Sequence, residues 1–98
     1  MSAQFTPGPW LAARMNPSSL CITQDRRGYY RCLIVTAKDT IGEARGKTEA
    51  EVEANANLIA AAPDLYEALE HIVNGALSLP RFAEEEARAA LAKARGEP

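Results

Sequence analysis

The sequence has few of the residues on which most metal and redox sites depend. Its 98 residues include two cysteines, Cys21 and Cys32, and one histidine, His71. A structural zinc site needs four ligands at recognisable spacing, and three such residues cannot supply one. We expect both thiols to be reduced and buried, and we expect no bound metal and no other cofactor.

Catalytic motifs are missing as well. The chain contains no glycine-rich phosphate loop, no H-E-x-x-H and no G-x-S-x-G. No segment combines a nucleophile, a base and an orienting group. His71 lies beside the apolar face of a predicted helix, where a lone histidine is more often structural or solvated than a base. The sequence therefore predicts a protein that binds a partner and is not an enzyme.

Long apolar runs and targeting signals are absent too. No run approaches the roughly 20 apolar residues of a membrane helix. The start MSAQFTPGPW lacks the basic and apolar regions of a signal peptide. Apolar residues make up 47% and charged residues 24% of the chain, which is typical of a folded domain. We expect residues 1–98 to form a single small domain in the cytoplasm.

Charge is distributed unevenly along the chain. Residues 1–47 contain seven Lys/Arg and three Asp/Glu, a net charge of +4, whereas residues 48–98 contain four and ten, a net charge of −6. The two values add to the total of −2. Either the two halves attract each other in the fold, or the basic half faces an anionic ligand.

The second half is predicted to be helical, and the segment from Thr48 to Leu69 carries the clearest pattern. Thr48 and Glu51 form a T-x-x-E capping box at the start of a helix. Pro63 ends that helix, since the residue before a proline avoids helical geometry. Asp64 and Glu67 begin a second helix. Apolar positions at helical spacing give the two helices one buried face each: Val52, Leu58, Ile59 and Ala62, with Asn55 on the same stripe, then Leu65, Ala68, Leu69, Ile72 and Val73.

A third helix is predicted after the Asn74-Gly75 stop, over Arg81 to Arg95, with Gly96 as its cap. Its narrow apolar stripe is rich in alanine, which suits close contact between helices of one subunit or of two. The stripe consists of Phe82, Ala83, Ala87, Ala90, Leu91 and Ala94. We therefore expect a homo-oligomer.

The first half is predicted to be an antiparallel meander of three or four strands, so the fold class is α+β with the meander packed on two or three C-terminal helices. Strands are expected over residues 10–15, 20–24, 29–37 and 40–44. The turn at Asp25–Gly28 predicts a hairpin. If that loop is symmetric, the numbers of the two residues in each cross-strand pair add to 53. Cys21 then faces Cys32 across the hairpin.

Basic and aromatic residues are interleaved in this β half. A small anionic nucleotide needs two or three cations, a ring for stacking and an amide to read a base edge. Trp10 is either a core anchor or such a stacking surface. The candidate ligand-binding residues are Trp10, Arg26, Arg27, Tyr29, Arg31, Asn55 and Asn57.

Three segments resemble a family of small tailed-phage and prophage proteins. They are TPGPW at Thr6–Trp10, NANLIAAAPDLYEAL at Asn55–Leu69 and ARAALAKARGE at Ala87–Glu97. Tyr66 stands where that pattern usually has leucine. The resemblance implies a phage accessory protein in the host cell cytoplasm, of the kind often active against host defence.

The predicted order of strands before helices, with Asn55 at the start of N-A-x-L-I, is also similar to the Thoeris anti-defence sponges. Those proteins are oligomers that sequester cyclic ADP-ribose-type signals between subunits. This similarity implies a non-enzymatic counter-defence protein. Two alternatives remain. One is an inhibitor of a host immune complex, such as an anti-CRISPR, that acts through its acidic helical face. The other is a phage protein that binds nucleic acid.

Overall fold

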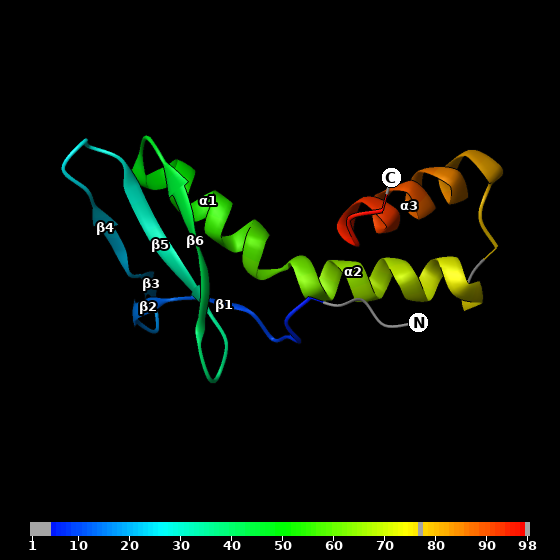
Figure 1. Cartoon of the computed structure of the whole chain (residues 1–98), viewed down its shortest axis with the longest axis horizontal. Helices are drawn as coiled ribbons and strands as arrows, with labels where there is room; N and C mark the ends of the chain where they lie inside the picture. Colours follow the sequence, from blue (N-terminus) through cyan, green and yellow to red (C-terminus); the bar gives the residue numbers. More distant parts are fainter. Residues whose placement is uncertain (1–4, 77, 98) are drawn as a thin grey trace. The chain divides into compact units, whose positions relative to one another are not determined.

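The structure, a computed structural model, describes residues 5–76 and 78–97. They form two compact units (Figure 1). The sheet unit, Pro7–Pro63, holds all the strands and the first helix. The helical unit joins the residues after Pro63 to the described residues before Pro7. Antiparallel strands come first and three α-helices follow, which confirms the predicted α+β class.

Strand β5 (Tyr30–Val35) is the centre of the main sheet (Figure 1). Strand β6 (Thr40–Gly46) pairs with it along one side and is longer than the short edge strand predicted over residues 40–44. Two short strands, β1 (Leu11–Ala12) and β4 (Ile22–Gln24), share its other side. All of these pairings are antiparallel, as a meander requires.

The edge made by β1 and β4 is one strand interrupted by a small hairpin. The hairpin consists of β2 (Arg14–Asn16) and β3 (Ser19–Leu20). The Ala13 amide donates to the Leu33 carbonyl at 2.8 Å, and the Cys21 amide donates to the Ala13 carbonyl at 2.8 Å. Ala13 and Cys21 therefore close the base of the hairpin, and the continuous strands predicted over residues 10–15 and 20–24 are each broken there.

The predicted register of the β4–β5 hairpin is wrong by one residue. Ile22 pairs with Cys32 and Thr23 with Arg31, so paired numbers add to 54 and not to 53. The reason is the loop length. The Asp25 amide donates to the Tyr29 carbonyl at 2.8 Å, which leaves the odd number of residues 26–28 in the loop, with Gly28 at φ +90°.

Cys21 and Cys32 consequently do not face each other, and both are free thiols. Cys32 is 1% exposed. Its burial raises the pKa of the thiol above the ordinary value of 9.0, a backbone hydrogen bond with Ala13 opposes the rise, and the nearby Cys21 adds to it. The Cys32 thiol is therefore protonated at neutral pH.

Helix α1 (Glu49–Ala60) covers one face of the sheet. Val52 and Ala56 are fully buried against the core, and Asn55 and Ile59 beside them are half-buried. This stripe follows helical spacing. Leu58, predicted to belong to it, lies outside it and is 65% exposed.

The capping box at the start of α1 forms with one difference. The Glu51 amide donates to Thr48 Oγ1 at 3.1 Å, as predicted. Glu51 Oε1 accepts from the Lys47 amide at 2.7 Å, one residue before the expected Thr48 amide. The helix ends near Pro63, as predicted, but α2 (Ala62–His71) begins two residues before Asp64 and contains Pro63 in its first turn.

Two of the segments that carry the phage-family resemblance meet in the sheet unit. Pro63 is fully buried, and a Cβ on Gly8 would lie 3.2 Å from Pro63 Cβ. Trp10 is half-buried and packs against the core that contains Val52 and Ala56. TPGPW and the end of NANLIAAAP are therefore complementary packing surfaces.

The helical unit pairs α2 and the segment η1 (Ile72–Ala76) with α3 (Arg81–Ala94) (Figure 1). Its buried residues are Tyr66, Val73, Ala87 and Leu91. The Phe5 ring lies edge-on to the Tyr66 ring, with centroids 5.0 Å apart. Of the predicted alanine-rich stripe, Ala87 and Leu91 are buried in this core and Ala83 is half-buried, while Phe82, Ala90 and Ala94 are exposed.

Both predicted helix stops are present. Gly75 has φ +116° and ends the second helical segment. After α3, Gly96 has φ +78°, its amide donates to the Lys93 carbonyl at 3.0 Å, and the Glu97 amide donates to the Ala92 carbonyl at 2.9 Å. This pair of bonds is a Schellman cap.

Candidate functional site

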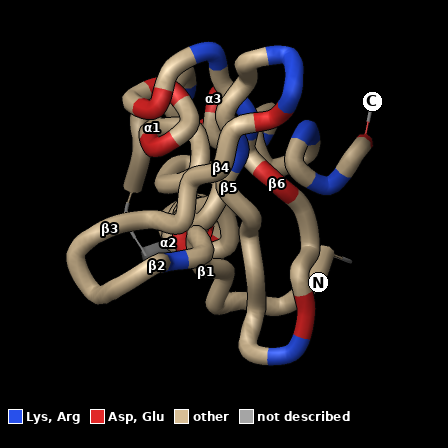
Figure 2. The backbone as a smooth tube through the Cα atoms, turned by 90° about the vertical axis from the view of Figure 1, so that its left-hand side faces the viewer, with Lys and Arg blue, Asp and Glu red and all other residues tan. Residues whose placement is uncertain are grey.

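A hollow in the sheet unit lies where the β4–β5 loop, the end of β6 and the start of α1 come together. It has a volume of about 280 Å³ and is lined by Tyr29, Arg45, Gly46, Lys47 and Glu51. We call it the Tyr29 hollow. Figure 2 shows basic residues in blue both in the β4–β5 loop and between β6 and α1. An exposed ring and two cations thus line one concave surface.

The loop that presents Tyr29 is held by one carboxylate. Asp25 Oδ1 accepts hydrogen bonds from the Arg27 amide at 2.9 Å and from the Tyr29 amide at 3.0 Å. Aspartate favours such local bonds to the backbone that follows it. The Tyr29 ring is left 42% exposed at the rim of the hollow.

The charges around Arg45 are partly balanced. Its guanidinium lies 3.4 Å from Glu43 and 3.9 Å from Asp25, and Glu43 also lies 3.8 Å from Arg31. Lys47, Arg26 and Arg27 have no ion pair within the described ranges. These three side chains carry the surplus positive charge beside the hollow.

The structure distributes the predicted ligand residues among several places. Tyr29 lines the hollow, and the exposed Arg26 and Arg27 lie in the adjoining loop. Arg31 is exposed on β5, where its Nε donates to Thr23 Oγ1 at 3.3 Å. Trp10 packs on the core and Asn57 is exposed on α1, and neither lines the hollow.

Arg45 and Lys47 line the hollow but were not among the predicted residues. The sequence did contain a signal, since Arg45-Gly46-Lys47 directly precedes the helix cap at Thr48. A basic tripeptide before a helix start places cations beside free backbone amides. The acidic first turn, Glu49 and Glu51, opposes an anion at those amides.

Asn55 makes a structural contact through its side-chain amide. Its Nδ2 donates to the Arg45 carbonyl at 2.7 Å. In the main sheet that carbonyl belongs to β6, which pairs only on its β5 side in the described part of the chain. Asn55 therefore ties helix α1 to the unpaired edge of the sheet.

Replacing Asn55 with alanine is expected to lower the free energy of unfolding by about 1–2 kcal/mol, because the Arg45 carbonyl loses its donor. Asn57→Ala is the matched control, since Asn57 is exposed on the same helix. Both changes gain helix propensity equally. Urea unfolding followed by Trp10 fluorescence measures the difference. Equal stability of the two variants would contradict this role for Asn55.

Among residues 5–76 and 78–97, no group of three or more His, Cys, Asp or Glu side chains is placed to hold a metal ion. Within the same residues, none of the helices has the length and apolar character needed to cross a bilayer.

Comparison with known proteins gives one match. The family model described as Salmonella phage P22 protein Y8K6 matches residues 1–98, which is the whole chain. No curated protein and no solved structure matches. The family match confirms the phage-family part of the predicted resemblance.

Proposed function

Because the chain belongs to the family of Salmonella phage P22 protein Y8K6, we propose that it is a phage counter-defence protein that binds and sequesters a small anionic nucleotide signal. The observation that carries the proposal is the Tyr29 hollow. It places an exposed ring beside Arg45 and Lys47, with Arg26 and Arg27 in the adjoining loop. Stacking on the ring and pairing with the cations suit a nucleotide base and its phosphate.

The protein acts by holding this ligand in the host cell cytoplasm, without transforming it. The ligand class is a cyclic nucleotide or an ADP-ribose isomer, bound where two subunits of a homo-oligomer meet. A volume of about 280 Å³ is slightly below the roughly 300 Å³ at which pockets for small molecules usually begin. A second subunit would complete the enclosure.

Calorimetry with a panel of cyclic nucleotides and ADP-ribose isomers tests the proposal. Tyr29→Ala is expected to weaken binding of the best ligand about tenfold, which is the loss of one stacked base. Lys47→Gln is expected to weaken it by a similar factor. Arg14→Gln is the control, because Arg14 is exposed in β2 and lies outside the hollow.

Two results would contradict the proposal. One is the absence of binding by every member of the panel. The other is an equal loss of affinity in Arg14→Gln. Chromatography of the ligand after incubation tests the non-enzymatic part, and a new product would refute it.

A second candidate function rests on the helical unit. Leu65 is 55% and Phe82 is 69% exposed there, and Asp64, Glu67, Glu85 and Glu86 are exposed on the same two helices. Apolar side chains among carboxylates suit an inhibitor that contacts a basic surface of a host immune complex. Co-purification of such a complex by the wild type, lost in Phe82→Ser and kept in Tyr29→Ala, would favour this function over sequestration.

A further inference from the structure

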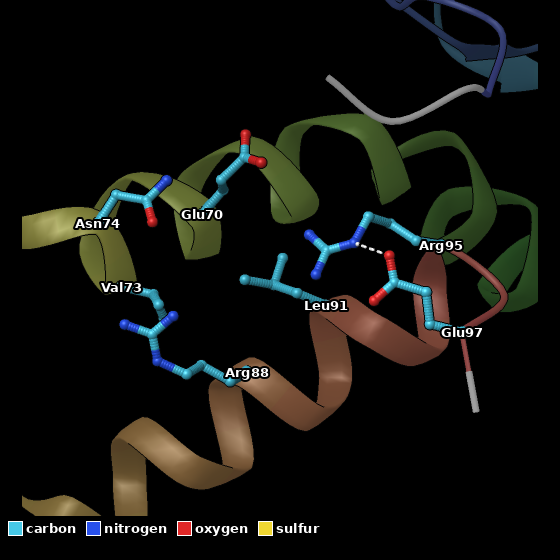
Figure 3. Close-up of a pocket in the computed structure, with 7 residues that line it drawn as sticks. All are labelled: Glu70, Val73, Asn74, Arg88, Leu91, Arg95 and Glu97. Carbon is cyan, nitrogen blue, oxygen red and sulfur yellow. Dashed lines mark hydrogen bonds and ion pairs between the residues drawn. The ribbon is translucent and has the colours of Figure 1, made fainter. Parts of the chain in front are cut away.

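A second hollow lies entirely within the helical unit, between the α2–η1 segment and α3 (Figure 3). Its volume is about 380 Å³, within the range typical of ligand pockets. Glu70, Val73 and Asn74 line one side, and Arg88, Leu91 and Arg95 line the other together with Glu97. We call it the Arg88 hollow. Its charged residues are not among those predicted from the sequence to bind a ligand.

The floor of the Arg88 hollow is apolar. Val73 is 8% and Leu91 is 4% exposed, and both belong to the core of the helical unit. In Figure 3, the guanidinium groups of Arg88 and Arg95 lie on either side of Leu91. Arg88 lies in α3 and Arg95 is its C-cap, and the spacing of seven residues places both on the same side of the helix. Two cations thus flank an apolar surface.

Both guanidinium groups are held in place by neighbouring side chains. Arg95 Nε donates to Glu97 at 2.9 Å and Arg95 Nη1 donates to the Tyr66 hydroxyl at 3.0 Å. Arg88 Nε and Nη2 lie 3.0 Å and 2.9 Å from the same oxygen of Glu84. These bonds fix the planes of the two groups in advance of any ligand.

Donors remain after these contacts are made. A guanidinium has five N–H donors. In the described part of the chain each arginine uses two of them, so three on each are left for a ligand. The hydrogen bond to Tyr66, and then that to Glu97, raise the pKa of Arg95 further above its ordinary value. The Arg95 guanidinium is therefore positively charged at any physiological pH.

Glu70 limits the charge that the hollow accepts. It lies on the α2 side, is half-buried and has no ion pair or hydrogen bond within the described ranges. Its carboxylate repels a ligand with several negative groups. Two arginines match one planar or tetrahedral oxyanion.

We propose that the Arg88 hollow binds a small ligand with one oxyanion group, a carboxylate or a phosphate, attached to an apolar body. The oxyanion bridges the free donors of Arg88 and Arg95. The apolar body covers Val73 and Leu91, and the Asn74 amide hydrogen-bonds to a polar edge of it. This site is independent of the Tyr29 hollow and of the nucleotide proposed for it.

Titration of ¹⁵N-labelled full-length protein with benzoate, phenyl phosphate and inorganic phosphate tests the site. Benzoate or phenyl phosphate is expected to shift the signals of Arg88, Leu91 and Arg95, and to bind more tightly than inorganic phosphate, which has no apolar body. The tighter of the two aromatic ligands identifies the head group as carboxylate or phosphate.

Four variants separate the site from general charge effects. Arg88→Gln and Arg95→Gln are each expected to weaken binding about tenfold, through loss of a charge-assisted hydrogen bond. Glu70→Gln is expected to strengthen binding about fivefold, because a repelling charge is removed. Arg81→Gln is the control. Arg81 lies on the same helix and pairs with Glu85 at 3.2 Å, outside the hollow, so its loss leaves affinity unchanged.

Three outcomes would overturn the proposal: no binding of either aromatic ligand, equal weakening in Arg81→Gln, or weaker binding in Glu70→Gln. Arg95 also contacts Tyr66, so Arg95→Gln can disturb the core. Within the described residues the Arg88 side chain bonds only to Glu84, and it is 57% exposed, so Arg88→Gln tests the site without disturbing the core.

Discussion

Replacing Ile34 with alanine is expected to lower the free energy of unfolding of the sheet unit by about 2–5 kcal/mol. Ile34 is 1% exposed at the centre of β5 and is among the largest fully buried side chains. It pairs with Ala12 on one side and with Gly42 on the other. These small neighbours cannot fill the space that a truncated side chain leaves, so most of the cavity remains.

Leu33→Ala is the control for this prediction. Leu33 is the preceding residue of the same strand, points to the face of the sheet opposite α1 and is 42% exposed. Its truncation is expected to cost less than about 1 kcal/mol. Trp10 is the only tryptophan and packs on the core of the sheet unit, so its fluorescence during urea unfolding reports on this unit. Similar losses in the two variants would contradict the assignment of the core.

Replacing Gly46 with alanine is expected to lower the free energy of unfolding by about 1–3 kcal/mol through steric overlap. A Cβ there would lie 2.9 Å from the Val52 amide nitrogen and 2.9 Å from Glu51 Oε1. The first of these atoms belongs to the backbone of α1 and cannot rotate away. To remove this overlap, α1 has to move away from the sheet. That movement would also open the Tyr29 hollow, which Gly46 lines.

Gly42→Ala provides the control on the same strand. Apart from its own chain neighbours, no residue in the described part of the chain has an atom within 4 Å of the place that a Gly42 Cβ would take. That substitution is expected to be neutral or to stabilise by about 0.5 kcal/mol, since alanine loses less backbone entropy on folding. Thermal unfolding of the pair measures the contrast. Equal stability would show that the close approach of α1 to Gly46 is not required.

Much of the fold follows from local patterns in the sequence. The capping box at Thr48, the break near Pro63 and the stops at Gly75 and Gly96 are chemical signals confined to a few residues. The structure confirms each of them to within two residues. The β-rich half before Thr48 is equally clear, because aromatic and β-branched residues favour strands.

What the sequence did not predict depends on contacts between distant residues. The hairpin inserted between Ala13 and Cys21 is closed by bonds to the neighbouring chain segments, which alternation of apolar residues does not reveal. The register of the β4–β5 hairpin depends on the three-residue loop that the backbone bond from the Asp25 amide to the Tyr29 carbonyl closes. A loop longer or shorter by one residue shifts every pair of the hairpin.

The candidate sites were predicted only in part. Tyr29 was identified by its type, but Asn55 was assigned to a ligand although its amide bonds to the Arg45 carbonyl. The residue type alone does not reveal whether an amide side chain faces a ligand or a backbone carbonyl. Arg88 and Arg95 were not predicted to bind a ligand, because their shared hollow depends on how α3 packs on α2.

The hairpin between β1 and β4 also shows where this chain can change length. Ala13 and Cys21 hold its two ends together, and Leu20 at 6% exposure anchors it in the core. The tip at Pro17 and Ser18 is exposed, and in the described part of the chain it joins no other strand. Residues can therefore be added at the tip without shifting the register of the main sheet, which makes it a suitable position for grafting an epitope or a fluorophore.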